Sequence, residues 1–340
     1  MGLHRKGLGQ LNTEQLADAI LKELDGPSCV SGYRTMWHTL RIKYGIVVPR
    51  REVQKLLKEL DPTGTEERKR RRLKRRNYTS SGPNQCWHID GYDKLKPFGF
   101  AIHGAIDGYS RHVLWLKVGR TNNNPSVIAQ YYLQCIKELG GCPRQLRTDP
   151  GTENGVMAGM QCYLRADGED DLAGQRAHSY GASTANQRIE CWWSYLRRNR
   201  TSWWINFFKD LCDDGVLVRG TILHDECLWF CFSSIIQHDL EFVKLHWNTH
   251  RIRPSRFETV PGKPEELFFL SEEFGGENQM QPLDEAKVEE LQEHLHSDDN
   301  VESNDYQEYF EYIIESQGLM RPTNWRDALS LFRYLVRIAV

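Results

Sequence analysis

Three acidic residues, two beside short apolar segments and one within a helical pattern, constrain the fold of this chain more than any other feature. Asp90 follows a short apolar stretch, Asp149 ends another, and Glu190 lies inside a helical pattern. The intervals between them are 58 and 40 residues, so only a tertiary fold can bring the three carboxylates together. Once together, they can hold two divalent metal ions, and a metal pair about 4 Å apart can clamp the attacking and leaving oxygens of a phosphoryl transfer.

The segments around these acids predict an α/β core. Apolar residues at helical spacing followed by Gly-Gly-Cys-Pro indicate a helix and its end, and short apolar runs between turn residues indicate strands. The expected strands span residues 85–91, 98–107, 111–118 and 144–148, and the expected helices span residues 124–139 and 184–200. Asp149 therefore stands at a strand end, where open α/β sheets usually place catalytic groups.

Four segments, in order, carry a resemblance to one enzyme superfamily. Residues 87–90 (Trp-His-Ile-Asp) resemble its first-strand motif, and residues 105–111 resemble the junction of its second and third strands. Residues 148–153 resemble its Ser-Asp-x-Gly-x-Glu/Asp segment, with Thr for Ser and Pro after the Asp. Residues 247–254 resemble the Asn-x-x-Arg-Pro-His segment that closes many insertion-sequence cores. The chain is thus similar to the retroviral-integrase and transposase superfamily, and most of all to eukaryotic transposon-derived integrase-like proteins.

The resemblance implies a ribonuclease-H-like mixed sheet flanked by helices in a catalytic core at residues 83–270. It implies that Asp90, Asp149 and Glu190 are catalytic and bind metal, with two Mg²⁺ or Mn²⁺ ions per active site. The implied reaction is metal-dependent cleavage at DNA 3′ ends and strand transfer, as in DNA integration and recombination. Because two DNA ends must be joined in concert, we expect a homo-oligomer that binds transposon ends and target DNA.

Two other classes of function share parts of this pattern. A ribonuclease-H-like nuclease has the same fold and metals but would cut without joining ends. A host-adopted, non-catalytic DNA-binding protein would have no need of three acids, so the intact trio argues against it.

Several acids also have structural interpretations. Asp149 could cap a turn, since Asp-Pro-Gly is ordinary turn chemistry, and Glu190 could be an exposed helix acid. Asp107 is the main decoy, because the matching position in the family is usually not a metal ligand. Glu153 is expected to support the loop after Asp149.

The helix that carries Glu190 places Gln187, Ser194 and Arg197 on the same face. In the resembled enzymes this helix lies along the substrate DNA end, so these three residues are expected to contact DNA near the cut. A solvated helix end is the alternative. Four tryptophans are expected to pack in a core or interface rather than to stack on bases, namely Trp192, Trp193, Trp203 and Trp204.

The first 64 residues predict an all-α helix-turn-helix domain. Apolar spacing predicts helices at residues 11–24, 32–44 and 49–60, with Gly45 as a break and Pro49 in the first turn of the third helix. A plain three-helix bundle with a solvated basic face is the alternative. The residues suited to a major groove are Arg50, Arg51, Gln54, Lys55 and Lys58.

A basic linker is expected at residues 65–82. Eight of the nine residues at 68–76 are basic, and contact with DNA phosphates would make binding steeply salt-dependent. They are Arg68, Lys69, Arg70, Arg71, Arg72, Lys74, Arg75 and Arg76. The same run fits a nuclear localisation signal, so a nuclear protein is expected. A merely solvated linker is the alternative.

The C-terminal region has the opposite charge. Residues 261–340 contain 18 Asp and Glu against 6 Lys and Arg, although the whole chain has a net charge of only −2. Polar, acidic composition predicts a linker or partly disordered stretch at residues 271–305. Two apolar-periodic pieces predict a small helical tail in the remainder, so residues 271–340 are interpreted as an acidic linker and a helical tail.

The nine cysteines indicate buried free thiols rather than a disulfide framework. His224, Cys227 and Cys231 have ligand-like spacing but no obvious fourth ligand, which disfavours a structural zinc. No apolar run is long enough for a transmembrane helix, and no apolar signal region is seen at the N-terminus. Neither membrane insertion nor secretion is therefore expected.

Overall fold

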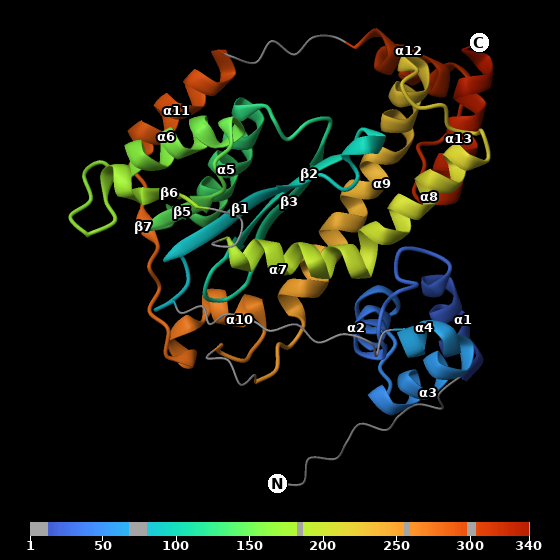
Figure 1. Ribbon diagram of the computed structural model, residues 1–340, viewed down its shortest axis with the longest axis horizontal. Helices are drawn as coiled ribbons and strands as arrows, with labels where there is room; N and C mark the ends of the chain where they lie inside the picture. The colour runs from blue at the N-terminus through green and yellow to red at the C-terminus, as the bar shows by residue number, and fades with distance from the viewer. Residues whose placement is uncertain (1–12, 68–79, 182–185, 255–258, 298–303, 340) are drawn as a thin grey trace. The chain divides into compact units, whose positions relative to one another are not determined.

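The computed structural model describes residues 13–67, 80–181, 186–254, 259–297 and 304–339 (Figure 1). These residues form two compact units. The smaller unit contains the described residues before residue 77 together with Ser194–Phe207, and the larger unit contains the remainder. All three candidate acids belong to the larger unit.

A five-stranded mixed sheet forms the centre of the larger unit. Its strand order is β3-β2-β1-β5-β6. β2 pairs antiparallel with both β1 and β3, whereas β5 runs parallel to both β1 and β6. The strands span Cys86–Tyr92 (β1), Ala101–Asp107 (β2), Val113–Gly119 (β3), Gln145–Thr148 (β5) and His178–Tyr180 (β6). This arrangement confirms the ribonuclease-H-like α/β fold class that the sequence predicts.

Strand β2 begins later than its apolar pattern suggests. β2 was expected from residue 98, but Lys96–Phe98 forms a 3₁₀ turn (η1) that ends at Gly99 with a φ of 83°. A left-handed residue interrupts an extended run, and glycine adopts that conformation without steric cost.

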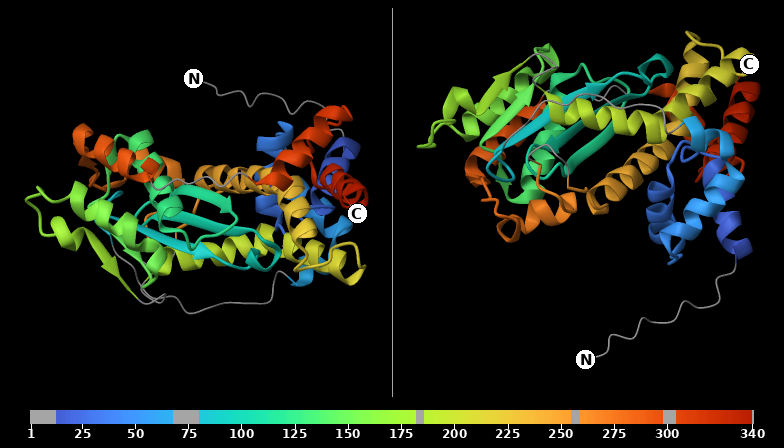
Figure 2. Two further views of the ribbon diagram at one scale, coloured as in Figure 1. Left: turned by 90° about the horizontal axis from the view of Figure 1, so that it is seen from above. Right: turned by 60° about the horizontal axis from the view of Figure 1, so that its bottom comes forward.

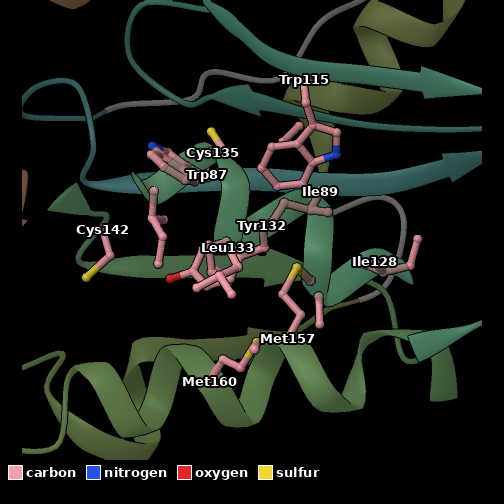
Figure 3. Close-up of a cluster of buried hydrophobic side chains, with 14 of the residues drawn as sticks. Trp87, Ile89, Trp115, Ile128, Tyr132, Leu133, Cys135, Cys142, Met157 and Met160 are labelled. Atoms are coloured by element: carbon pink, nitrogen blue, oxygen red, sulfur yellow. The ribbon is translucent and has the colours of Figure 1, made fainter. Parts of the chain in front are cut away.

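Helices α5 (Pro125–Leu139) and α6 (Gly155–Leu164) pack against the sheet in one apolar core, drawn in Figure 3. The Asn124 side chain caps α5 by accepting a hydrogen bond from a backbone amide of its first turn. Trp87 of β1 meets Tyr132 of α5 edge to face, with ring centroids 6.4 Å apart. The core therefore lies directly beneath the strand that carries Asp90.

A long helix, α9 (Ile222–Thr249), runs along the edge strand β3 (Figure 2). The Gln237 side chain accepts a hydrogen bond from the backbone N of Val118 at 2.9 Å. Asn248 accepts from the backbone N of Val113 at 2.8 Å and donates to its carbonyl at 3.0 Å. These side chains satisfy outward backbone groups of an edge strand, which would otherwise offer a pairing site to another chain.

The acidic C-terminal region is more ordered than predicted. β7 (Gln281–Pro282) pairs antiparallel with β4 (Gly141–Cys142), and α11 (Glu285–Ser297) adds Val288 to the core beside α5 and α6. The prediction of a linker or partly disordered stretch at residues 271–305 is wrong for this part. A few apolar residues on α11 are enough to order this segment, because they pack on the apolar surface of α5 and α6.

The predicted helical tail is confirmed as two helices. Both pack against α9, where Phe310 and Phe332 are fully buried. The remaining short elements of the larger unit lie before them in the chain. These elements and the tail span Thr152–Asn154 (η2), Gly174–Ala177 (η3), Pro264–Phe269 (α10), Ser271–Phe274 (η6), Asp305–Ser316 (α12) and Trp325–Ile338 (α13).

The smaller unit is all-helical at its N-terminal side. Its helices span Thr13–Leu24 (α1), Tyr33–Tyr44 (α2), Arg50–Leu60 (α3) and Pro62–Glu67 (α4). The first three confirm the predicted helices, and Gly45 ends α2 with a φ of 65°. Ile20, Met36 and Val53 from these three helices share one fully buried apolar core.

The helix predicted at residues 184–200 extends further. α7 (Gln187–Leu196) continues through a π-helical turn, η5 (Arg197–Thr201), into α8 (Ser202–Asp213). Within the smaller unit, Arg200 of this turn is buried and its Nη1 donates to Ser28 Oγ at 2.5 Å. One continuous helix therefore contributes residues to both compact units. Across the described ranges, no helix has both the length and the hydropathy needed to cross a bilayer.

Candidate active site

Asp90 and Asp149 come from neighbouring parallel strands. Asp90 is the fifth residue of β1, and Asp149 directly follows the last residue of β5. His88 of β1 is paired with Arg147 of β5, and continuing that register by two residues places Asp149 beside Asp90. Both acids are half-buried. The predicted position of Asp149 at a strand end is confirmed.

Asn186 fixes the start of α7, the helix that carries Glu190, against β1. Its side-chain oxygen lies 2.8 Å from His88 Nδ1, and its amide nitrogen donates to the Ile89 carbonyl at 2.9 Å. Burial lowers the pKa of His88 to about 3, so the imidazole is neutral and Nδ1–H donates to the amide oxygen. This clamp sets the helix so that Glu190, one turn on, comes within electrostatic range of the two aspartates.

The three carboxylates repel one another. Burial raises the pKa of Asp90 to about 7 against the lowering effect of the Trp193 indole, and the charges of Asp149 and Glu190 add to the rise. Burial, and then the charge of Asp149, also raises the pKa of Glu190. Half-buried acids that perturb one another at a strand end are typical of functional sites.

A tryptophan binds the first carboxylate. The Nε1 of Trp193 donates to Asp90 Oδ2 at 2.8 Å, and its buried ring packs against Tyr92 with centroids 5.3 Å apart. The sequence predicted only packing for this tryptophan. The signal that could have found it is its position three residues after Glu190, because residues three apart on a helix are neighbours on its surface.

Asp107, the expected decoy, is a structural acid. It accepts hydrogen bonds from the backbone N atoms of Asn84, Tyr109 and Ser110 at 2.7, 3.1 and 2.7 Å, and from the Ser110 hydroxyl at 2.7 Å. Four donors occupy about as many sites as a carboxylate offers. Asp107 therefore holds the turn between β2 and β3 and has no capacity left for a metal.

Glu153 braces the loop that follows Asp149. Its Oε1 accepts a hydrogen bond from Asn154 Nδ2 at 3.0 Å, and the same amide reaches the Asp149 carbonyl at 3.4 Å. The carboxylate also lies over Gly151, where a Cβ would come within 2.5 Å of its carbon. These contacts agree with the supporting role expected for Glu153.

The carboxylate oxygens of the three candidate acids fit a hard divalent cation that is shared with substrate. Among the described residues, no group of three or more His, Cys, Asp or Glu side chains is arranged to hold a metal ion. Mg²⁺ does not need such a cage, because it commonly binds one or two carboxylates, several waters and substrate phosphates. Asp90 interacts electrostatically with both Asp149 and Glu190, so it can bind a cation together with either of them. Cations between such pairs would relieve their repulsion.

The predicted DNA-contacting residues fall into three groups. On α3, the side chains of Arg50, Arg51, Gln54, Lys55 and Lys58 are all exposed. Along the helix that carries Glu190, Gln187 is half-buried, whereas Ser194 and Arg197 are exposed. The eight basic residues at 68–76 lie outside the described residues.

Comparison with known proteins adds a family. A family model described as "Integrase core domain" matches residues 77–272. A chain of the cryo-EM structure of the simian T-cell lymphotropic virus intasome in complex with PP2A regulatory subunit B56 gamma is similar at 15% sequence identity. That alignment covers 78% of this chain and 77% of the other, with a TM-score of 0.33, and adds nothing to the family match. No curated protein matches.

Proposed function

The chain belongs to the integrase core domain family, and we propose that it is a DNA transposase or integrase, a metal-dependent polynucleotidyl transferase. It would cleave DNA at 3′ ends and transfer the freed strand ends into target DNA. The observation that carries this proposal is the convergence of Asp90 in β1, Asp149 directly after β5 and Glu190 on α7, where the charges of Asp149 and Glu190 help to raise the pKa of Asp90.

The three acids would together bind the metal in this proposal. Asp90 and Asp149, from neighbouring strands, would hold two Mg²⁺ or Mn²⁺ ions, and Glu190 would complete one of the two sites. When bound, such ions lower the pKa of a coordinated water and stabilise charge on the phosphate oxygens. The Asn186 clamp holds Glu190 at a set distance from β1. No covalent protein intermediate is required, so no Ser, Tyr or Cys nucleophile is assigned.

DNA binding would use three surfaces of the chain. The exposed face of α3 is suited to a major groove, the basic run at residues 68–76 to phosphates, and Gln187, Ser194 and Arg197 to the DNA end near the cut. Concerted joining of two ends requires a homo-oligomer. The basic run would also direct the protein to the nucleus.

The test is a cleavage and joining assay with purified full-length protein. Its DNA carries the sequences that flank the gene, and reactions contain Mg²⁺, Mn²⁺ or a chelator. We expect metal-dependent cleavage and joined products, both lost in Asp90→Asn, Asp149→Asn and Glu190→Gln, while DNA binding persists. A substitution that retains joining removes its residue from the site.

Other outcomes identify other functions. Cleavage without joined products would indicate a ribonuclease-H-like nuclease. DNA binding without cleavage in either metal would indicate a non-catalytic DNA-binding protein. Both outcomes contradict the proposed transferase.

A further inference from the structure

We propose that Trp193 is a positioning residue that holds the Asp90 carboxylate in the orientation needed to bind divalent metal. The inference rests on the proposed function, because it takes Asp90 to be a metal ligand. Its basis is the 2.8 Å hydrogen bond from Trp193 Nε1 to Asp90 Oδ2, which joins residues 103 positions apart. The bond connects the strand of the first acid directly to the helix of the third, Glu190.

The fold holds the indole in place from several sides. Trp193 is only 5% exposed and packs against Tyr92 and, at 5.2 Å between centroids, against Trp192. Gly104 stands directly opposite Asp90 in the pairing of β1 with β2. A Cβ at Gly104 would lie 2.9 Å from Trp193 Cη2 and 3.2 Å from a backbone carbonyl of β3. The missing side chain on β2 therefore makes the space that the indole occupies.

An indole is chemically suited to this task. Its N–H is a donor only, so it cannot ligate the metal in place of the carboxylate. It carries no charge, so unlike Lys or Arg it adds no positive charge beside a cation site. A carboxylate offers about four lone-pair sites, so the hydrogen bonds from Trp193 and from the Gly91 backbone still leave acceptor sites of Asp90 for metal. The bond from Trp193 also removes the rotational freedom that Asp90 would otherwise lose on binding.

The test measures Mn²⁺ binding to the full-length protein by electron paramagnetic resonance, without any reaction. Partners that orient metal ligands typically contribute about 10–100-fold in affinity. We therefore expect Trp193→Phe to weaken Asp90-dependent Mn²⁺ binding by about tenfold or more. Trp115→Phe is the matched control, because its buried indole donates instead to His103 Nδ1, at 3.1 Å. That control should bind Mn²⁺ as the wild type does.

Two further measurements separate positioning from a merely structural role. Benzothienylalanine at position 193 keeps the size of the ring and removes only the N–H, and it should reproduce the weaker binding with an unchanged unfolding midpoint. In metal-free protein, the indole ¹H–¹⁵N resonance of Trp193 should move when Asp90→Asn is introduced, and that of Trp115 should move less.

The possible failures are distinguishable. If Asp90→Asn abolishes Mn²⁺ binding while both changes at Trp193 leave it at the wild-type level, the positioning role is wrong and the proposed function stands. An indole resonance that does not respond to Asp90→Asn overturns the positioning role in the same way. Wild-type protein without any Asp90-dependent Mn²⁺ binding would overturn the proposed function and the positioning role together.

Discussion

Two aspartates on adjacent strands differ in how fully their oxygens are satisfied. Asp107 is completely buried and receives four hydrogen bonds from its own turn and the segment beside it. Asp90 receives hydrogen bonds from the Trp193 indole and the Gly91 backbone, and it faces the charges of Asp149 and Glu190. A carboxylate whose acceptor sites are all hydrogen-bonded stabilises the fold, whereas a carboxylate with free acceptor sites and repelling neighbours is available to a ligand.

Replacing these two aspartates by asparagine should affect stability to different extents. Asp107→Asn places an amide N–H₂ against N–H and O–H donors, and we expect it to lower the free energy of unfolding by about 1–3 kcal/mol. Asp90→Asn removes a repelled charge and should cause no comparable loss. Urea denaturation of the two variants in a chelator measures the difference. An Asp107→Asn protein as stable as the wild type would contradict the structural role.

The carboxylate cluster also predicts a pH dependence. Folding raises the pKa of Asp90 to about 7, from about 3.9 in an unfolded chain. The stability contributed by this group is therefore fully present below the unfolded value and is lost as the pH rises through the folded one. With a chelator present, wild-type protein should lose stability relative to Asp90→Asn between about pH 4 and pH 7.

Thermal unfolding of both proteins across this pH range, in a chelator and in Mg²⁺, provides the measurement. Added Mg²⁺ should stabilise the wild type above pH 7 and leave Asp90→Asn nearly unchanged. Parallel pH profiles for the two proteins would show that the Asp90 carboxyl is not perturbed by folding.

At the scale of elements, the sequence predicted the helices and strands whose signals are local. Asn124 and Gly140 bracket α5, and Gly45 ends α2, as their chemistry requires. Helix α9 escaped prediction because its buried residues include Cys227–Leu228 and 230–232, which lie on several faces and leave no single apolar stripe.

In the candidate site, too, only the features with local sequence signals could be predicted. Its three acids were predictable because short motifs surround them. The hydrogen bond between Trp193 and Asp90 was not, because no local pattern specifies a contact between two elements 103 residues apart. The π-helical turn after α7 was likewise missed, since its sequence continues the helical pattern of the residues before it.

The basic face of α3 makes a prediction that belongs to that helix alone. If Lys55 contacts a phosphate, Lys55→Ala should reduce the slope of log affinity against log salt by about 0.9, because one fewer counterion is released. Stability should not change, because the side chain is exposed. Fluorescence anisotropy with duplex DNA at several salt concentrations gives the slope. Lys22→Ala, which removes an exposed lysine of a different helix, α1, is the control, and equal slopes for the two variants would contradict a DNA-binding α3.

At the scale of the larger unit, α9 joins two apolar layers. It packs against β3 and bonds its backbone, and it also contacts α12 and α13. Apolar periodicity predicted the helical tail, whereas composition predicted only a linker at residues 271–305, because composition averages over a segment and does not report where its few apolar residues stand. Phe310 of α12 and Phe332 of α13 are fully buried, so the C-terminal helices are part of the folded body that carries the candidate site.

This organisation predicts that damage to the C-terminal helices destabilises the whole unit. Phe332→Ala removes a fully buried ring that meets His224 of α9 edge to face at 5.8 Å, and we expect it to cost about 3–5 kcal/mol. Tyr312→Ala on α12 removes a ring that is 64% exposed and should change stability by less than about 0.5 kcal/mol.

Urea unfolding followed by both tryptophan fluorescence and circular dichroism distinguishes two organisations of the chain. If α13 belongs to the folded body, Phe332→Ala should shift the main transition to lower urea with both probes together, because the elements unfold cooperatively. If α13 were an appendage, the substitution would instead create a separate early transition in circular dichroism and leave the main transition where it is in the wild type. The second result would show that the C-terminal helices unfold independently of the folded body.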